Sequence, residues 1–127
     1  MTSNATIVRN TYKSIFANDV EAVMDILSDN VVWHTRGWGP LTGDYQGKDE
    51  VRGLLQKFSM LTEGSAETEV ESFLEDGNRI VTVMSTRQEK PQVHESKHVD
   101  IWDMRDGKLV EYWGIQADQT GAAQAFS

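Results

Sequence analysis

Residues 94–117 read HESKHVDIWDMRDGKLVEYWGIQA, and this stretch decides the fold. It holds two runs that are rich in β-branched and aromatic residues, about 94–104 and 108–117, joined by Asp106-Gly107. Asp-Gly between two such runs is a strong signal for a tight β-hairpin turn. The stretch therefore predicts two antiparallel strands near the C-terminus.

Toward the N-terminus, turn signals recur at short intervals and predict two more strands, about 66–74 and 79–88. The turn Glu75-Asp76-Gly77-Asn78 separates these strands, and a looser connection through Pro91 leads into residue 94. No helical stripe competes with the strands in this part of the chain. We therefore expect the second half of the chain to be a four-stranded meander.

The first half of the chain carries three helical patterns. They predict a helix over 5–17, a second helix capped by Asn18 with Glu21 in the capping-box position, and a third from 47 to Gly64. Their apolar faces are, in order, Val8, Tyr12, Ile15 and Phe16; Val20, Val23, Met24 and Leu27; and Val51, Leu54, Leu55 and Phe58. A short strand is expected at 31–36, after Asp29-Asn30 and before the Gly37-Trp38-Gly39-Pro40 loop.

Helices followed by antiparallel strands is the order of an α+β domain, with the helices packed on one face of the sheet. A twisted sheet of about five strands curls around the three N-terminal helices and leaves a cone that is open at one end. We expect this cone to be a pocket for a small organic ligand. With 127 residues, 39% of them hydrophobic, the chain fits one domain over 1–127.

Composition and charge exclude several classes of function. A net charge of −8 disfavours nucleic acid and anionic membrane surfaces as partners. The absence of cysteine excludes disulfides, thiolate catalysis and zinc sites built on sulfur. The chain shows neither a signal-peptide pattern nor an apolar run of membrane-spanning length, so we expect a cytoplasmic protein.

Five pieces of the chain, in order and spacing, resemble the SnoaL-like and ketosteroid-isomerase-related proteins of the NTF2-like superfamily. They are 12–19 (YKSIFAND), 29–33 (DNVVW), 43–47 (GDYQG), 98–102 (HVDIW) and 106–113 (DGKLVEYW). The resemblance implies a cone-shaped α+β barrel that often forms homodimers through its sheet. It also implies isomerase, aldol-type polyketide cyclase or epoxide hydrolase chemistry without a metal or organic cofactor, although other members of the superfamily are not catalytic.

Strand alternation selects the catalytic candidates. It places Val99 and Ile101 on one face of their strand, and on the other face His94, Ser96, His98, Asp100 and Trp102. The resemblance matches Asp100 to the strand aspartic acid of ketosteroid isomerases, which donates a hydrogen bond to the developing oxyanion. We expect Asp100 to line the cone with His98 as its proton partner. The alternative is a solvated strand carboxylate.

Two positions depart from the family pattern. The isomerase base, an aspartate on the first strand, falls at Thr35, and the cyclase aspartate of the last strand falls at Gly114. His34 is adjacent to Thr35 but points to the opposite face of a regular strand. The epoxide hydrolases place a cation two residues before a strand aspartate, as His98 precedes Asp100. Their second carboxylate would have to be Asp118.

The ligand-binding candidates are aromatic or hydrogen-bonding side chains: Tyr12, Trp33, Thr35, Trp38, Trp102, Tyr112 and Gln116. Tyr112 and Gln116 share a face of the last strand and can hydrogen-bond a carbonyl or a hydroxyl. Gly37 and Gly39 would allow the loop that carries Trp38 to move as a lid. For each aromatic residue, ordinary core packing is the competing interpretation.

A metal site is not expected. His94, His98 and Asp100 match the residue types of a two-His, one-carboxylate iron site. Same-face positions along a regular strand lie too far apart for easy three-point ligation, and the resemblance argues against it.

Two functions remain open. The first is a cofactor-free enzyme that acts on a hydrophobic, oxygenated molecule such as a polyketide or terpenoid intermediate. The second is a non-catalytic ligand-binding or dimerisation module, which the loss of both family bases favours. By analogy we expect a homodimer that forms through the outward face of the sheet, including Val81, Val83, Val99 and Ile101.

Overall fold

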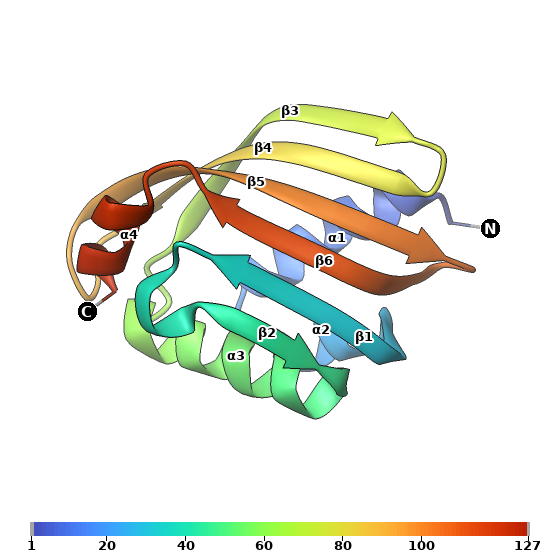
Figure 1. The fold of residues 1–127 in the computed structure, drawn as a ribbon, viewed down its shortest axis with the longest axis horizontal. Coiled ribbons are helices and arrows are strands. Elements are labelled where there is room, and N and C mark those ends of the chain that lie inside the picture. The colour runs from blue at the N-terminus through green and yellow to red at the C-terminus, as the bar shows by residue number, and fades with distance from the viewer. Residues whose placement is uncertain (1, 127) are drawn as a thin grey trace.

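The computed structural model describes residues 2–126 as four α-helices, one 3-10 turn and one six-stranded sheet (Figure 1). The helices are α1 (Asn4–Phe16), α2 (Val20–Met24), α3 (Gly47–Thr62) and α4 (Gln119–Ala125), and the 3-10 turn is η1 (Gly39–Leu41). The strands are β1 (Leu27–Arg36), β2 (Gly43–Gln46), β3 (Glu67–Asp76), β4 (Arg79–Gln88), β5 (His94–Arg105) and β6 (Lys108–Gln116). The predicted α+β class is confirmed.

The sheet is curved and does not close. Its strand order is β2-β1-β6-β5-β4-β3, so β2 and β3 are free edges. All neighbouring strands are antiparallel except β1 and β6, which run parallel. The helices α1, α2 and α3 cover one face, and α4 lies at one end of the sheet (Figure 1). This arrangement is the cone that the sequence predicted. The sheet was expected to be wholly antiparallel, and the parallel pairing of β1 with β6 corrects that expectation.

The Asp106-Gly107 hairpin has the conformation that its sequence predicts. Asp106 and Gly107 have φ values of 52° and 76°, so both central residues of the turn are left-handed. This is the pattern of a type I′ turn, whose twist matches that of the flanking strands. The turn holds β5 and β6 in register, with Asp100 opposite Gly114 and His98 opposite Gln116.

The boundary between the second helix and the first strand differs from the prediction. The helix ends at Met24 and the strand begins at Leu27, so Leu27 belongs to β1 and not to α2. A register shift between Leu27 and Val32 accommodates the polar residues that were expected to separate the two elements. Asn18 is not the cap, because it takes a left-handed φ of 61°; Asp19 caps α2 by accepting from the amide of Ala22.

The 3-10 turn η1, strand β2 and helix α4 were not predicted. Strand β2 has only four residues, GDYQ, and its pairing with β1 comes from the tertiary fold more than from its own β-propensity. Helix α4 lies in a segment that reads as a small-residue tail. The side chain of Asp118 accepts from the amide of Gly121 and caps this helix.

Aromatic side chains fill the centre of the core between the helices and the sheet. Trp102 on β5 is fully buried, and its ring lies 5.1 Å from that of Tyr12, 5.0 Å from that of Tyr112 and 6.2 Å from that of Trp33. The apolar faces of α1 and α3 pack against this group. Among the described residues, no helix has the length and apolar character needed to cross a membrane.

Candidate functional site

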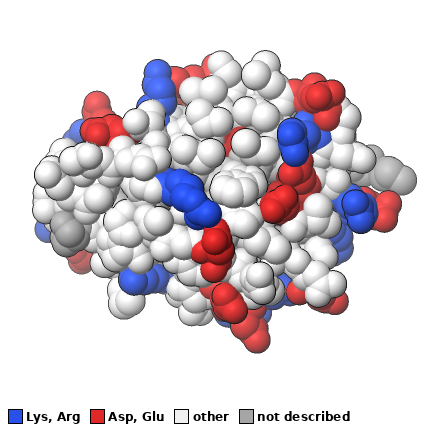
Figure 2. Space-filling view, viewed as in Figure 1, with Lys and Arg blue, Asp and Glu red and all other residues white. Residues whose placement is uncertain are grey.

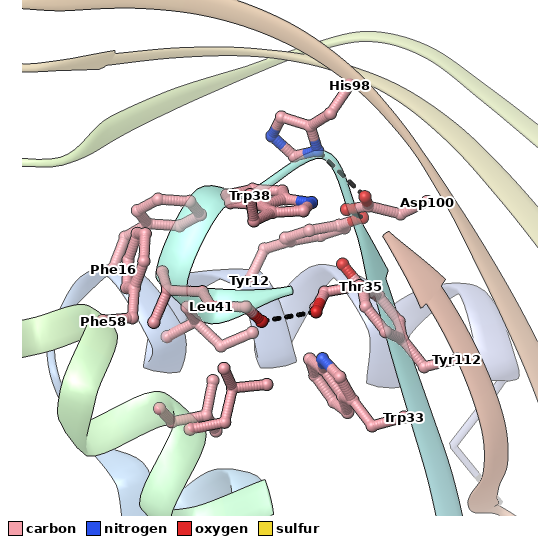
Figure 3. Close-up of a pocket in the computed structure, with 13 residues that line it drawn as sticks. Tyr12, Phe16, Trp33, Thr35, Trp38, Leu41, Phe58, His98, Asp100 and Tyr112 are labelled. Carbon is pink, nitrogen blue, oxygen red and sulfur yellow. Dashed lines mark hydrogen bonds and ion pairs between the residues drawn. The ribbon is translucent and has the colours of Figure 1, made fainter. Parts of the chain in front are cut away.

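A cavity of about 60 Å³ lies between the helices and the concave face of the sheet (Figure 3). The residues that line it are Tyr12, Ile15, Phe16, Trp33, Thr35, Trp38, Leu41, Leu54, Leu55, Phe58, His98, Asp100 and Tyr112. One water molecule needs about 10–15 Å³ of such space, so the cavity accepts a small chemical group as it stands. A larger ligand requires some of the lining side chains to move.

The alternation predicted for residues 94–102 agrees with the burial along β5. His98 and Asp100 are 3% and 0% exposed and line the cavity, whereas Val99 and Ile101 are half-buried on the other face. Trp102 shares the inward face but lies in the core and not at the cavity wall. The carboxylate that we selected is therefore inside the cone, next to the imidazole.

Asp100 is the centre of a buried hydrogen-bond network. The hydroxyl of Tyr12 donates to its Oδ2 over 2.5 Å, and Nδ1 of His98 lies 2.9 Å from its Oδ1 (Figure 3). On the far side of the imidazole, Nε2 lies 2.9 Å from Oγ1 of Thr86. A proton can therefore be shared between the carboxyl group and the imidazole without either side chain leaving its place.

Tyr12 holds the carboxylate in position. Its hydroxyl donates to Asp100, accepts from Nε1 of Trp102 over 2.9 Å, and lies 2.6 Å from Oγ1 of Thr82. Because the single phenolic proton goes to Asp100, Thr82 must donate to Tyr12. The hydrogen-bonding capacity of the Tyr12 hydroxyl is thus used inside the protein, and only the side of its ring is available to a ligand.

The two tyrosines beside Asp100 have perturbed acidities. Burial raises the pKa of Tyr12 well above its usual value, and the negative charge of Asp100 raises it further. Burial is also the main reason that the pKa of Tyr112 is raised, and Asp100 again adds to the effect. Both phenols therefore keep their protons in the folded protein at pH values where free tyrosine ionises.

We expect stability to fall as the pH rises above 10.0, the usual tyrosine value. Above it the unfolded chain releases protons that folded Tyr12 and Tyr112 still hold, so each phenol lowers the free energy of unfolding by about 1.4 kcal/mol per pH unit. This continues until the pH passes the raised pKa values. Urea unfolding between pH 9 and 12 gives the slope of the free energy of unfolding against pH. In Tyr112→Phe this slope should be shallower by the contribution of one phenol. An unchanged slope would contradict the assignment.

Thr35 and Trp38 bind the loop around η1 to the sheet. The hydroxyl of Thr35 donates to the carbonyl of Leu41 over 2.5 Å and accepts from the amide of Gly43 over 3.0 Å. The indole of Trp38 donates to the carbonyl of Gly114 over 3.0 Å, and its ring lies 5.2 Å from that of His98. These two candidates shape the cavity wall, but their polar atoms are already occupied.

Tyr112 occupies the space above Gly114, where the related cyclases carry an aspartate. A Cβ atom on Gly114 would lie 2.8 Å from Oη and 3.0 Å from Cε1 of Tyr112. The Tyr112 ring is itself stacked on Trp33, with ring centroids 3.9 Å apart. A side chain at position 114 would therefore displace the Tyr112 ring from its present place.

Two other candidates and His34 lie away from the cavity wall. Gln116 is 2% exposed, and in the described part of the chain neither of its amide atoms has a hydrogen-bond partner. It is not among the residues that line the cavity, and neither is Trp102. As the strand parity predicts, His34 lies on the outer face of the sheet, where it stacks on Trp113 and bonds Asp44 and Glu111.

Sequence reasoning had not selected several residues of the site. The apolar wall also contains Ile15, Phe16, Leu41, Leu54, Leu55 and Phe58. All but Leu41 lie on the helix faces expected to be apolar, so the sequence showed that they face inward but not that they border a cavity. The polar partners Thr82 and Thr86 carried no signal beyond alternation along β4.

No metal centre is evident in residues 2–126, because no three His, Asp or Glu side chains there are grouped closely enough to hold an ion. The two-His, one-carboxylate arrangement considered for His94, His98 and Asp100 is not formed in the described part of the chain.

Solved structures with the same architecture define the class of the fold. Bal32a, from a soil-derived mobile gene cassette, is 17% identical with a TM-score of 0.89, and the match covers 98% of this chain and 96% of that one. An NTF2-like protein of unknown function from Burkholderia pseudomallei is 23% identical with a TM-score of 0.87, covering 100% and 99%. TerC, co-crystallized with polyporic acid, is 20% identical with a TM-score of 0.80, covering 94% and 95%. The fold is NTF2-like.

The family follows from a sequence match. The model of the SnoaL-like domain matches residues 8–112, which is most of the chain, so the protein belongs to the SnoaL-like family of the NTF2-like superfamily. No curated protein matches the chain significantly.

Proposed function

We propose that the protein is a cofactor-free acid–base enzyme of the SnoaL-like type that acts on a hydrophobic, oxygenated small molecule. The observation that supports this proposal is the placement of Asp100, a fully buried carboxylate at the wall of an aromatic cavity, 2.9 Å from the imidazole of His98. Buried carboxylates are rare unless they are paired or have a function. Isomerisation, aldol-type cyclisation and epoxide opening all need proton transfer at such a site.

The roles of the residues follow from their contacts. Asp100 and His98 exchange the proton with the ligand, and Tyr12 is a positioning residue that fixes the carboxylate. The apolar lining excludes water and orients the ligand by shape. The family bases are absent at Thr35 and Gly114, so all proton transfer in this proposal passes through the pair on β5.

A panel of polyketide and terpenoid intermediates tests the proposal, with polyporic acid included because it was co-crystallized with TerC. Ligands found by thermal shift are then followed for turnover by mass spectrometry. We expect Asp100→Asn and His98→Ala to lower turnover by about 100-fold or more while ligand binding persists. Asp103→Asn is the matched control, because it removes an ion-paired carboxylate from the same strand outside the cavity. If Asp100→Asn and His98→Ala convert the ligand as fast as the control Asp103→Asn, the proposal is refuted.

A non-catalytic binding module is the second candidate. One observation favours it: both oxygens of Asp100 already have protein partners, Tyr12 and His98, so the carboxylate needs no ligand to complete its hydrogen bonds. In that case the panel yields ligands that bind but are not converted by the unaltered protein.

We also propose that the protein forms a homodimer through the outer face of its sheet. Val81 pairs with Ile101 and Val83 with Val99 across β4 and β5, and all four side chains are half-buried with no helix over them. Figure 2 looks onto this face and shows uncharged residues over much of it. Apolar area of this kind is typical of an interface core.

We expect the protein to sediment as a dimer and Val99→Lys to sediment as a monomer in analytical ultracentrifugation. A lysine at the centre of the face would have to be buried without a partner in the dimer. Val93→Lys is the control, since Val93 is 67% exposed and lies outside the strands. The same sedimentation for all three proteins would contradict this mode of assembly.

A further inference from the structure

We infer that the ligand of the cavity carries an anionic group, which binds at Arg9 and Lys13 in a groove between α1 and β3. This inference rests on the proposed function to the extent that it assumes a ligand in the cavity. It narrows the substrate class to amphipathic molecules with an apolar body and a carboxylate or a similar group. The bound species is a free small molecule.

The groove adjoins the cavity. Its walls are formed by Arg9, Tyr12, Lys13, Phe16, Ala66, Glu67, Thr68 and Val70. Tyr12 and Phe16 line both spaces, so their side chains form the boundary between the groove and the cavity. The groove has a volume of about 570 Å³. That volume lies within the range of roughly 300–1,000 Å³ found for ligand pockets, which the cavity by itself does not reach.

The two cations of the groove stand one helical turn apart. Arg9 and Lys13 are at positions i and i+4 of α1, so their side chains are neighbours on the helix surface. The guanidinium of Arg9 lies 4.0 Å above the ring of Phe73, a β3 residue that is not part of the groove wall. Two like charges at this spacing repel, and an anion between them would relieve the repulsion.

Neither cation is neutralised by the protein. In residues 2–126 no carboxylate lies within 4.0 Å of the charged groups of Arg9 or Lys13. Among the other cations of the described chain, Arg36, Lys48, Arg52, Arg79, Arg87 and Lys97 form ion pairs, whereas Lys57, Lys90, Arg105 and Lys108 do not. Arg9 and Lys13 differ from these four in standing next to each other at the wall of a groove. In a chain with a net charge of −8, two adjacent unpaired cations beside an apolar groove indicate an external anion.

Glu67 is the one acidic residue of the groove. It is exposed and lies on the β3 side, and no ion pair joins it to the two cations in the described chain. Its charge opposes an anion without cancelling the pair. Substitutions that remove charge should therefore have opposite effects at these positions. Loss of the Glu67 charge should strengthen anion binding, and loss of the Arg9 and Lys13 charges should weaken it.

Two fluorescent probes with the same rings and different charge test the inference. They are 1-anilinonaphthalene-8-sulfonate, which is anionic, and N-phenyl-1-naphthylamine, which is neutral. We expect the double variant Arg9→Gln/Lys13→Gln to weaken sulfonate binding about fivefold and to leave the neutral probe unchanged. Glu67→Gln should tighten binding of the sulfonate probe. Added salt should weaken binding of the sulfonate probe and leave binding of the neutral probe unchanged. Arg105→Gln is the control, an exposed cation outside the groove.

The outcomes separate this inference from the proposed function. If both probes bind and the double variant binds the sulfonate as tightly as the parent protein, the anion site is wrong and the apolar pocket stands. If the neutral probe does not bind at all, the cavity does not accept an apolar body, and both the inference and the proposed function fail.

Discussion

Replacement of Trp102 by alanine is expected to lower the free energy of unfolding by about 3–5 kcal/mol. Trp102 is fully buried and packs on the rings of Tyr12, Trp33 and Tyr112, so the change leaves a cavity among large and rigid neighbours. It also removes the indole that donates to the Tyr12 hydroxyl. Urea unfolding followed by circular dichroism measures the effect.

Two variants control this experiment. Trp102→Phe keeps most of the ring volume and loses the hydrogen bond to Tyr12, so its cost should be smaller. Trp113→Ala removes a half-buried tryptophan that stacks on His34 at the outer face of the sheet. If Trp113→Ala is as damaging as Trp102→Ala, the ring cluster around Tyr12 is not the main source of stability.

Gly114→Asp is expected to destabilise the protein by about 4 kcal/mol or more and not to introduce cyclase activity. The new Cβ would lie 2.8 Å from Tyr112 Oη, and Tyr112 would lose its stacking on Trp33 if it moved aside. Overpacking of this kind costs about 1–3 kcal/mol, and a buried, unpaired carboxylate adds several more. Thermal unfolding of the variant measures the loss.

Gly114→Ala separates the two contributions, because it adds the clash without the charge, and it should cost about 1–3 kcal/mol. The matched control is Gly53→Ala on α3, where an added Cβ meets nothing within 4 Å. That change should be stabilising by up to about 1 kcal/mol, since alanine is the better helix former. Similar stability for Gly114→Asp and the parent protein would show that Tyr112 can move aside.

Local sequence signals predicted the parts of the site that depend on local geometry. Alternation along residues 94–102 placed His98 and Asp100 on the same face of their strand, and Asp106-Gly107 predicted the hairpin that holds β5 beside β6. Both depend only on backbone periodicity and on turn conformation, which neighbouring residues determine. The shared face of His98 and Asp100 could therefore be predicted from local pattern alone, whereas its inward direction was inferred from the resemblance to ketosteroid isomerases.

The contacts of Asp100 could not be predicted in the same way. Tyr12, which donates to it, is 88 positions away in the chain, and Thr82 and Thr86 reach the network from another strand. Such pairings depend on how α1 crosses the sheet, which no local pattern specifies. The sequence also could not predict where Gln116 lies. A side chain that faces inward can belong either to the cavity wall or to the surrounding core, and Gln116 belongs to the core.

The parallel pairing of β1 with β6 has a consequence for synthesis in the cell. Residues 32–36 find their second neighbour only in residues 111–115, so a nascent chain that has not emerged past that point contains a strand with one open side. Backbone groups on an open strand edge can pair with other chains. Ribosome-bound chains that end before residue 111 should therefore be the form of this protein that most needs a chaperone.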